Sequence, residues 1–324
     1  MRIINASQVR ELLPMDECID AMDQAMRAVS AGEVSIPPRI IMPLHGTAGF
    51  LGAMPGSAGS PRIDGAKLIS QHAGNPARGL PAIQGFVALF DPDNGTPRAL
   101  VDGAEITGIR TAAASGLATR LLARSDARSH GILGTGVQAV THIDAIAASR
   151  DIEETLIWGR DFSKARSLAH QQAERTGRKY RAVDSPELAA GCDIVTTVTA
   201  AAEPILMGAW IHQGTHVNLV GAHSPDSREA DSELMATAFV YCDLTESLFN
   251  ESGDVLIPLN EGRMDRSQIR GEIGSLAAGD IPGRQNPDEI TVYKSLGITA
   301  QDLFAAQLVL EKALARDVGE EVTL

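Results

Sequence analysis

The feature that most constrains this chain is a glycine-rich loop between an apolar, strand-like segment and a helical one. The loop, Gly134-Thr135-Gly136-Val137-Gln138-Ala139, fits the pattern G-x-G-x-x-G/A. In this pattern the first glycine makes a tight turn, the second lets a pyrophosphate approach the backbone, and the following helix offers free N–H groups. An ordinary tight turn is the alternative, but the strand predicted at 130–133 and the helix predicted at 140–148 favour dinucleotide binding. We predict cofactor contacts from Gly134, Thr135, Gly136, Val137 and Gln138.

Strand-like and helical segments alternate along the rest of the middle region. Helical sequence separates short apolar runs at 155–158, 193–198, 216–220 and 239–242. This alternation is typical of α/β proteins and predicts a Rossmann-type, doubly wound parallel sheet. Thr197 and Val198, in the second of these runs, are further candidate cofactor contacts.

The first third of the chain has a different pattern. Apolar residues at helical spacing predict a helix over 14–31. Short apolar runs bounded by glycine or proline predict strands at 50–56, 66–70 and 86–90. The last of these leads through Asn94-Gly95, which accepts the positive φ of a tight turn, into a paired strand. We expect an antiparallel or mixed sheet with a leading helix, hence an α+β domain.

Two further helices are predicted. The segment 111–123 is rich in small residues that allow close packing. The segment 300–315 is amphipathic and no strand follows it, so it either returns to the first domain or serves a subunit contact.

Composition and charge narrow the class of protein. Apolar residues make up 44% and charged residues 21%, which supports a packed core, and the formal net charge of −13 argues against nucleic-acid binding. Three scattered cysteines indicate a reducing compartment, and no apolar run approaches the roughly 18 residues of a membrane span. A signal peptide is not expected, since charge appears early in the N-terminal segment. We expect a cytoplasmic protein without a membrane segment, and His212 and His216 do not suggest a metal site.

The residues after the second strand of the middle region bear on the choice between NAD and NADP. Arg160, Ser163 and Lys164 offer a guanidinium, a hydroxyl and an ammonium to a 2′-phosphate. Glu153 and Glu154 precede the strand instead of ending it, as an NAD-type acid would. A solvated charged turn is the alternative, and Asp161 opposes the positive potential. The pattern favours NADP(H) over NAD(H).

A series of segments resembles the ornithine cyclodeaminase and mu-crystallin family over nearly the whole chain. They are IPPRIIMPL, FLGAMPG, GAKLIS, GTPRALVDGAEITGIRTAAASGLATRLLAR, GILGTGVQA and VNLVGAHSPDSRE. The resemblance implies a homodimer of two-domain subunits that holds a small amino or imino acid over the nicotinamide. We expect a substrate-binding and dimerisation domain from residues 1–112 plus 303–324 and a dinucleotide domain from residues 113–302.

The resemblance also assigns substrate-binding residues. Arg39, on a stiff segment after two prolines, and Arg110, just before the predicted 111–123 helix and its dipole, match arginines that bind the substrate carboxylate. Structural salt bridges are the alternative. Lys67 lies in apolar strand sequence, where it is either an edge residue whose amine reaches solvent or a functional group with a lowered pKa. The family match favours substrate contact and catalysis by Lys67.

Two positions separate subfamilies. Cyclodeaminases typically carry acids where this chain has Gly52 and His223, so ornithine cyclodeamination is disfavoured. His223 either donates a proton or holds a second carboxylate, unless it is only a packed or solvated loop residue. The segment from Tyr293 to Gly297 resembles the family segment near the nicotinamide. Ser295 and Gly297, together with Thr111, complete the candidate cofactor contacts.

These observations predict an NAD(P)H-dependent oxidoreductase that reduces a small α-imino acid. Cyclic ketimines such as Δ1-pyrroline-2-carboxylate are the leading substrates. Acyclic imino acid reduction or amino acid dehydrogenation, on iminosuccinate or alanine, is an alternative, and ornithine cyclodeamination is another. A crystallin-like protein that binds NADPH and a ligand without turnover is an alternative of a different class. Retention of Lys67 and both arginines favours an enzyme.

Overall fold

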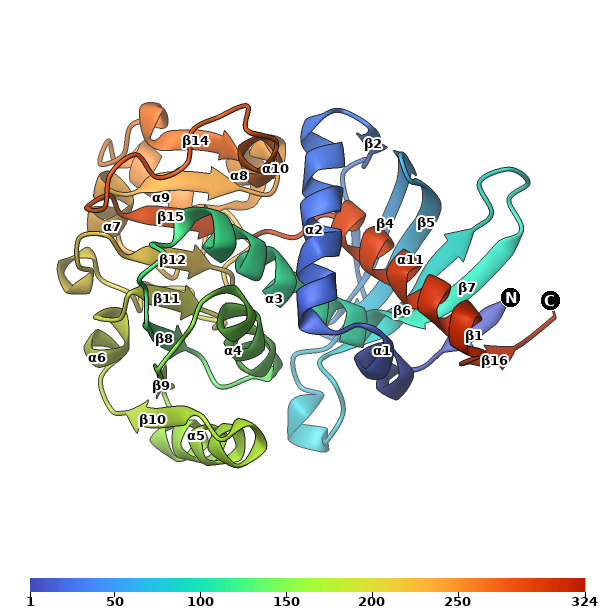
Figure 1. Cartoon of the computed structure of the whole chain (residues 1–324), viewed down its shortest axis with the longest axis horizontal. Helices are drawn as coiled ribbons and strands as arrows, with labels where there is room; N and C mark the ends of the chain where they lie inside the picture. Colours follow the sequence, from blue (N-terminus) through green and yellow to red (C-terminus); the bar gives the residue numbers. More distant parts are fainter. Residues whose placement is uncertain (324) are drawn as a thin grey trace. The chain divides into compact units, whose positions relative to one another are not determined.

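The computed structural model describes residues 1–323, which form two compact units (Figure 1). Of the described residues, unit 1 contains 1–111 and 297–323, and unit 2 contains Ala112–Leu296. The segment 297–302, which we expected in the dinucleotide domain, belongs to unit 1. The reason is visible in its contacts, because Gln301 and Asp302 bind side chains of that unit.

Unit 1 is built on a mixed sheet, as the sequence predicts. Its strands follow the order β16-β1-β7-β6-β5-β4-β2, and β3 pairs with β4. The β1–β7 pair is parallel and the other pairs are antiparallel. The strand bounds are β1 Arg2–Ile4, β2 Val34–Ser35, β3 Ile40–Pro43, β4 Phe50–Gly59, β5 Arg62–Gln71, β6 Ile83–Phe90, β7 Pro97–Asp102 and β16 Glu320–Glu321.

Helices α1 (Ala6–Leu12), α2 (Met15–Ser30) and α11 (Thr299–Arg316) lie wholly in unit 1. Helix α11 packs on β5, β4 and α2, so the C-terminal helix returns to the first domain. Gly65 of β5 allows this close approach, because a Cβ atom there would lie 2.4 Å from the Ala88 carbonyl oxygen and 2.7 Å from Leu303. The approach places the first turn of α11 against β5, where Lys67 lies.

Unit 2 carries the predicted doubly wound sheet. Its eight strands are all parallel, in the order β10-β9-β8-β11-β12-β15-β13-β14. The strand order reverses between β8 and β11, and in open α/β sheets ligands bind outside the carboxyl ends of the strands at such a point. The strand bounds are β8 Ser129–Leu133, β9 Glu154–Trp158, β10 Lys179–Val183, β11 Ile194–Thr197, β12 His216–Leu219, β13 Phe239–Cys242, β14 Ile269–Glu272 and β15 Thr291–Lys294.

Helices connect these strands. Their bounds are α4 Val137–Ser149, α5 Phe162–Thr176, α6 Pro186–Ala190, α7 Ser232–Thr237, α8 Thr245–Glu251, α9 Gly253–Asn260 and α10 Ile273–Ala278. Helix α4 begins at Val137, within the glycine loop and three residues earlier than predicted. Among residues 1–323, no helix combines the length and apolar character needed to cross a membrane.

The prediction of a helix start at residue 111 is wrong. Helix α3 spans Gly103–Leu122 and crosses from unit 1 into unit 2 along the chain. It begins early because the Asp102 carboxylate accepts a hydrogen bond from the Glu105 N–H at 2.8 Å and so caps the first turn. Arg110 therefore lies in the body of the helix, and the expected contribution of a helix N-terminus beside it does not apply.

Candidate functional site

Unit 1 contains a buried cluster of charged side chains, Lys67, Arg110 and Asp302, which we call the unit 1 cluster. Lys67 Nζ lies 2.7 Å from Asp302 Oδ2, and Arg110 Nε lies 2.9 Å from Asp302 Oδ1. The three side chains are at most 6% exposed. Lys67 comes from β5, Arg110 from α3 and Asp302 from the first turn of α11. The cluster thus joins segments that are far apart in the sequence.

Lys67 is not an edge residue that reaches solvent. It pairs with Met54 of β4 on one side and Val87 of β6 on the other, and it is only 2% exposed. Burial lowers the pKa of Lys67 to about 8, although the charge of Asp302 opposes this shift. An ammonium with such a pKa can donate a proton near neutral pH.

Asp302 holds both cations in place. Burial alone would raise the pKa of this carboxyl group, but Arg110 and Lys67 together hold it below its usual value. Asp302 is therefore ionised at neutral pH. One carboxylate facing two buried cations leaves a local excess of positive charge, which suits an anionic ligand.

Gly297 links the two candidate arginines of unit 1. The Gly297 carbonyl accepts a hydrogen bond from Arg39 Nη2 at 2.8 Å. Gly297 has φ +76°, and a Cβ atom there would lie 2.7 Å from Arg110 Nη1. Glycine is required at this position, because any other side chain would displace the Arg110 guanidinium, which also donates to Gln301. Gly297 was predicted as a cofactor contact; in the structure its carbonyl binds Arg39, and its lack of a side chain leaves room for Arg110.

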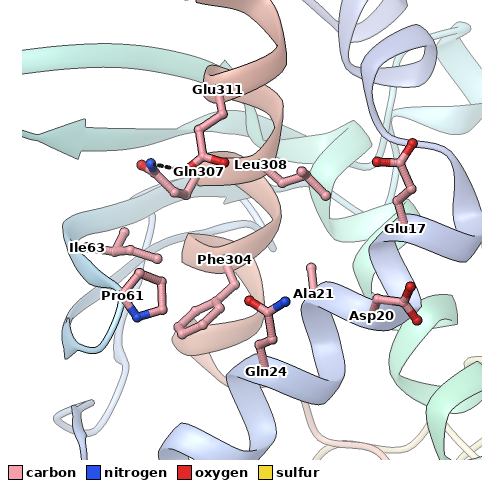
Figure 2. Close-up of a pocket in the computed structure, with 10 residues that line it drawn as sticks. All are labelled: Glu17, Asp20, Ala21, Gln24, Pro61, Ile63, Phe304, Gln307, Leu308 and Glu311. Atoms are coloured by element: carbon pink, nitrogen blue, oxygen red, sulfur yellow. Dashed lines mark hydrogen bonds between the residues drawn. The ribbon is translucent and has the colours of Figure 1, made fainter.

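Unit 1 also contains a hollow that is lined by acidic side chains, in contrast to the positively charged unit 1 cluster (Figure 2). It lies between α2 and α11, with Phe304 and Ile63 at its floor and Glu17, Asp20 and Glu311 around it. These carboxylates would repel an anionic substrate. The hollow is therefore a poorer candidate for an amino or imino acid than the unit 1 cluster.

Unit 2 contains a pocket of about 340 Å³ at the carboxyl ends of β8, β9 and β11. We call it the dinucleotide pocket. Its lining residues are Gly134, Thr135, Gly136, Trp158, Gly159, Arg160, Asp161, Lys164, Val198, Thr199, Ala200, Ala201 and Ile205. Six of the predicted cofactor contacts are among them: Gly134, Thr135, Gly136, Arg160, Lys164 and Val198.

The glycine loop has the geometry of a backbone cradle. Gly134 has φ +136°, and a Cβ atom there would lie 2.7 Å from Val198. A Cβ atom on Gly159 would lie 2.6 Å from Thr135. The N-terminus of α4 has no side-chain cap, so an anion can take that place. The residues present fit a dinucleotide.

The predicted 2′-phosphate group of residues is only partly assembled. Arg160 and Lys164 both line the pocket, together with Asp161. Asp161 caps α5, and it accepts hydrogen bonds from the Ser163 N–H at 2.9 Å and the Ser163 hydroxyl at 2.6 Å. These hydrogen bonds from Ser163 lower the pKa of Asp161. The Ser163 hydroxyl is therefore committed to the helix cap.

The remaining predicted residues are not brought together in the pocket. Val137 is 75% exposed, the Thr197 hydroxyl donates to Glu229, and Ser295 is buried. The Thr111 hydroxyl donates to the Thr107 carbonyl within α3. Gln138, within the glycine loop, lies in the first turn of α4 and outside the pocket lining.

His223 follows β12 in unit 2, whereas Lys67 belongs to unit 1. The His223 side chain is exposed, and its Nδ1 lies 3.0 Å from the Gly221 carbonyl oxygen. Within residues 1–323, no group of three or more histidine, cysteine, aspartate or glutamate side chains could hold a metal ion.

The sequence analysis missed Asp302 and Gln301, although a signal for them exists. Both residues are fully buried, and Asp302 lies one turn before Ala306 and two turns before Leu310 on the apolar face of α11. A charged residue on the apolar face of an amphipathic helix needs a partner, which Lys67 and Arg110 provide. Trp158, Asp161 and the 199–201 segment of the pocket were also not predicted as contacts.

Comparison with known proteins identifies relatives that agree with one another. Residues 2–317 match the model of the ornithine cyclodeaminase/mu-crystallin family. The ketimine reductase mu-crystallin of Mus musculus is 38% identical over 281 residues, covering 86% of each chain. The structure of Thermococcus litoralis Δ1-pyrroline-2-carboxylate reductase with NADH and L-proline has a TM-score of 0.96 and 36% identity, covering 99% of this chain and 100% of that one. An archaeal alanine dehydrogenase dimer with bound NAD has a TM-score of 0.93 and 30% identity, covering 100% of this chain and 99% of that one.

Proposed function

Because the chain belongs to the ornithine cyclodeaminase/mu-crystallin family, we propose that it is an NAD(P)H-dependent reductase of small α-imino acids. Cyclic ketimines such as Δ1-pyrroline-2-carboxylate are the leading substrates. The observation that carries this proposal is the buried cluster of Lys67, Arg110 and Asp302. The relatives named reductases of Δ1-pyrroline-2-carboxylate and of ketimines support the substrate class.

In this proposal the arginines of unit 1 bind the substrate carboxylate. Arg39 donates a hydrogen bond to the Gly297 carbonyl, and the lack of a side chain at Gly297 leaves room for the Arg110 guanidinium, which Asp302 and Gln301 orient. Guanidinium matches carboxylate well because it presents paired N–H donors in one plane. The excess positive charge of the unit 1 cluster adds attraction for the same group.

Lys67 then serves the substrate nitrogen. Its pKa of about 8 lets it keep an imine nitrogen protonated near neutral pH and take up a proton again afterwards. Asp302 positions the Lys67 ammonium, because it is the hydrogen-bond acceptor 2.7 Å away. His223 remains a proposed second contributor, either as a proton donor or as the partner of a second carboxylate.

The dinucleotide pocket of unit 2 is proposed to bind the nicotinamide cofactor. A bound nicotinamide dinucleotide would supply the hydride, and the chain would supply orientation and charge. Gly134 and Gly136 would hold the pyrophosphate. Arg160 and Lys164 favour NADP(H), since they place two cations where a 2′-phosphate would need them, while Asp161 opposes part of that charge.

Steady-state oxidation of NADPH and NADH tests the function. The panel contains preformed cyclic imines, and 2-oxo acids with ammonia or methylamine. We expect the fastest oxidation with Δ1-pyrroline-2-carboxylate. Faster turnover of pyruvate or oxaloacetate with ammonia would instead identify the acyclic alternative. Binding of NADPH without oxidation in any mixture would identify a crystallin-like binding protein and overturn the proposal.

L-Ornithine with NAD is the negative control of the panel. Gly52 and His223 leave the chain without the acids that would hold a second ammonium group. Proline and ammonia should therefore not form at a rate of about 1 per second, which is at the low end of ordinary enzyme turnover rates. Formation at such a rate would restore the cyclodeaminase alternative.

We also propose a homodimer formed through the uncovered face of the unit 1 sheet. Ile40, Met42, Leu51 and Phe86 lie on that face and are 61%, 50%, 38% and 37% exposed. Their register places them opposite the face that carries Lys67 and α11. An exposed apolar patch of this kind is typical of an interface. Leu51→Glu should yield monomers in analytical ultracentrifugation, and an unchanged sedimentation coefficient would contradict this interface.

A cytoplasmic location completes the proposal. Cys18, Cys192 and Cys242 are all buried and unpaired. Free thiols persist in a reducing compartment. Fractionation of the producing cells tests this location, and recovery of the protein outside the cytoplasm would contradict it.

A further inference from the structure

Three charged side chains, Glu229, Asp254 and Lys294, are fully buried in unit 2. We call them the unit 2 network. They do not line the dinucleotide pocket, and the proposed chemistry does not use them. They lie beside the carboxyl ends of β11, β12 and β15, which are neighbours in the sheet.

Glu229 is the centre of the network and accepts four hydrogen bonds through its carboxylate. Two come from the N–H and the hydroxyl of Thr199, at 2.8 and 2.7 Å. The other two come from the Thr197 hydroxyl at 2.7 Å and the Gly221 N–H at 2.6 Å. The loops after β11 and β12 are therefore held by one carboxylate.

The main chain of Glu229 binds a second segment that lines the dinucleotide pocket. Its carbonyl oxygen accepts a hydrogen bond from the Ile205 N–H at 2.9 Å. Ile205 and Thr199 both line the dinucleotide pocket. One residue outside the lining thus fixes two segments of it, one through its side chain and one through its backbone.

Asp254 and Lys294 hold Glu229 in turn. Asp254 accepts hydrogen bonds from the Glu229 and Ala230 N–H groups at 2.8 and 3.0 Å. Lys294, at the end of β15, donates to Asp254 at 2.8 Å and to the Ala222 carbonyl at 2.6 Å. The network therefore runs from the segment after β11 to the residue that precedes His223.

Stability alone does not account for this arrangement. Burying ionic groups costs desolvation free energy that their mutual attraction often only balances, and apolar side chains of similar volume would be as stabilising. Burial raises the pKa of Glu229, although Lys294 and the threonine hydroxyls oppose the shift. What the network provides and apolar side chains cannot is a fixed set of hydrogen bonds to loop backbone groups.

We propose that Glu229 is a positioning residue that sets the shape of the dinucleotide pocket by fixing Thr199 and Ile205. This inference rests on the proposed function, because it assumes that the pocket binds a nicotinamide dinucleotide. Asp254 and Lys294 act through Glu229 and through the Ala222 carbonyl. None of the three lines the dinucleotide pocket.

The test compares Glu229→Gln with Asp193→Asn. Asp193 makes a similar set of hydrogen bonds at the opposite, amino-terminal edge of the same sheet, to the Arg128 and Ser129 N–H groups, the Ser129 hydroxyl and Arg124. Both substitutions should lower the melting temperature. Only Glu229→Gln should weaken NADPH and NADH binding, by about tenfold or more, which corresponds to about 1.4 kcal/mol. Fluorescence titration of the reduced cofactor measures this.

A second pair of variants covers the case in which Glu229→Gln does not fold. Thr197→Val removes one hydroxyl donor to Glu229, whereas Thr197→Ser keeps it. The valine variant should bind the cofactor several-fold more weakly, and the serine variant should bind it as the wild type does.

Unchanged cofactor affinity in Glu229→Gln, or an equal loss in Asp193→Asn, would overturn the positioning role. So would equal affinities of the two Thr197 variants. Failure of the wild type to bind NADPH or NADH would overturn the proposed function itself. This outcome is distinct from failure of the positioning role, because it is seen in the wild type without any substitution.

Discussion

The candidate sites of the two units are built in different ways. The dinucleotide pocket of unit 2 is made of short segments, from a loop that is contiguous in the sequence and from the ends of neighbouring strands. The unit 1 cluster is made of charged side chains, and 235 residues separate Lys67 from Asp302. The dinucleotide pocket requires glycines, which have no side chain, whereas the unit 1 cluster requires buried charges that compensate one another.

This difference has a physical consequence. An added methyl group at Gly134 would collide with Val198, so the unit 2 pocket tolerates little added volume. Removal of one charge from the unit 1 cluster leaves the others buried without compensation. Substitutions in the dinucleotide pocket should therefore change mainly cofactor affinity, whereas substitutions in the unit 1 cluster should change turnover and stability.

The sharpest test of this division is Lys67→Met, which keeps the side-chain length and removes the charge. Turnover of imine should fall by about 10²–10⁴-fold, the usual range for a lost proton donor. The affinity for NADPH should stay near the wild-type value, because the pocket residues belong to unit 2. Steady-state kinetics and fluorescence titration measure the two effects.

Lys67→Arg is the matched variant. It keeps the positive charge, but guanidinium neither deprotonates near neutral pH nor has the compact shape of an ammonium, so turnover should not recover. Near-normal turnover of the methionine variant would mean that Lys67 is structural and that the proton comes from His223 or water.

The second test concerns the interdependence of the charges. Asp302→Asn leaves Lys67 and Arg110 buried without a carboxylate, which should reduce the free energy of unfolding by about 3–5 kcal/mol. Asp93→Asn is the control, because Asp93 forms an exposed ion pair with Arg62 and solvent screening leaves such pairs little effect on stability. Similar urea midpoints for the two variants would contradict the interdependence.

The same comparison explains what the sequence could predict. Local patterns predict the glycine loop and the parallel sheet, and the structure confirms both. The family resemblance is confirmed by the match over residues 2–317. Local reasoning succeeds here because a strand, a tight turn and a helix N-terminus are specified by neighbouring residues.

The unit 1 cluster could be predicted only in part. Lys67 stands out as a charge within an apolar strand, but its partner Asp302 comes from a helix at the other end of the chain. No local pattern pairs the two, since their proximity depends on how α11 packs on β5. The start of α3 was not predicted, because its cap, Asp102, precedes the small-residue segment from which the helix was predicted.

The third test concerns the charged side chains that line the dinucleotide pocket. Arg160→Ala should weaken NADPH binding far more than NADH binding, by about 1–3 kcal/mol for a lost charged hydrogen bond. Arg166→Ala is the control, since Arg166 lies on helix α5 a few residues after Arg160, is exposed and does not line the pocket. Equal losses for the two cofactors would reject the 2′-phosphate role of Arg160.

The smallest expected effect is a pH dependence of stability that comes from unit 1 alone. Burial lowers the pKa of Lys67 to about 8, whereas a lysine in the unfolded chain titrates near 10.4, roughly its unperturbed value. Between these values the unfolded chain holds more protons than the folded one, so the free energy of unfolding contributed by this group rises with pH. The rise is at most about 1.4 kcal/mol per pH unit, and it vanishes below about pH 8, where both states are protonated.

Lys67→Met isolates this contribution, because every other titrating group is shared with the wild type. Urea unfolding of both proteins between about pH 7 and pH 10 should show the wild type gaining stability relative to the variant as the pH rises. Parallel pH profiles would mean that Lys67 keeps an ordinary pKa through its pairing with Asp302. In that case the unit 1 cluster would be a permanently charged carboxylate-binding site, and the proton transfer would have to be assigned to another group.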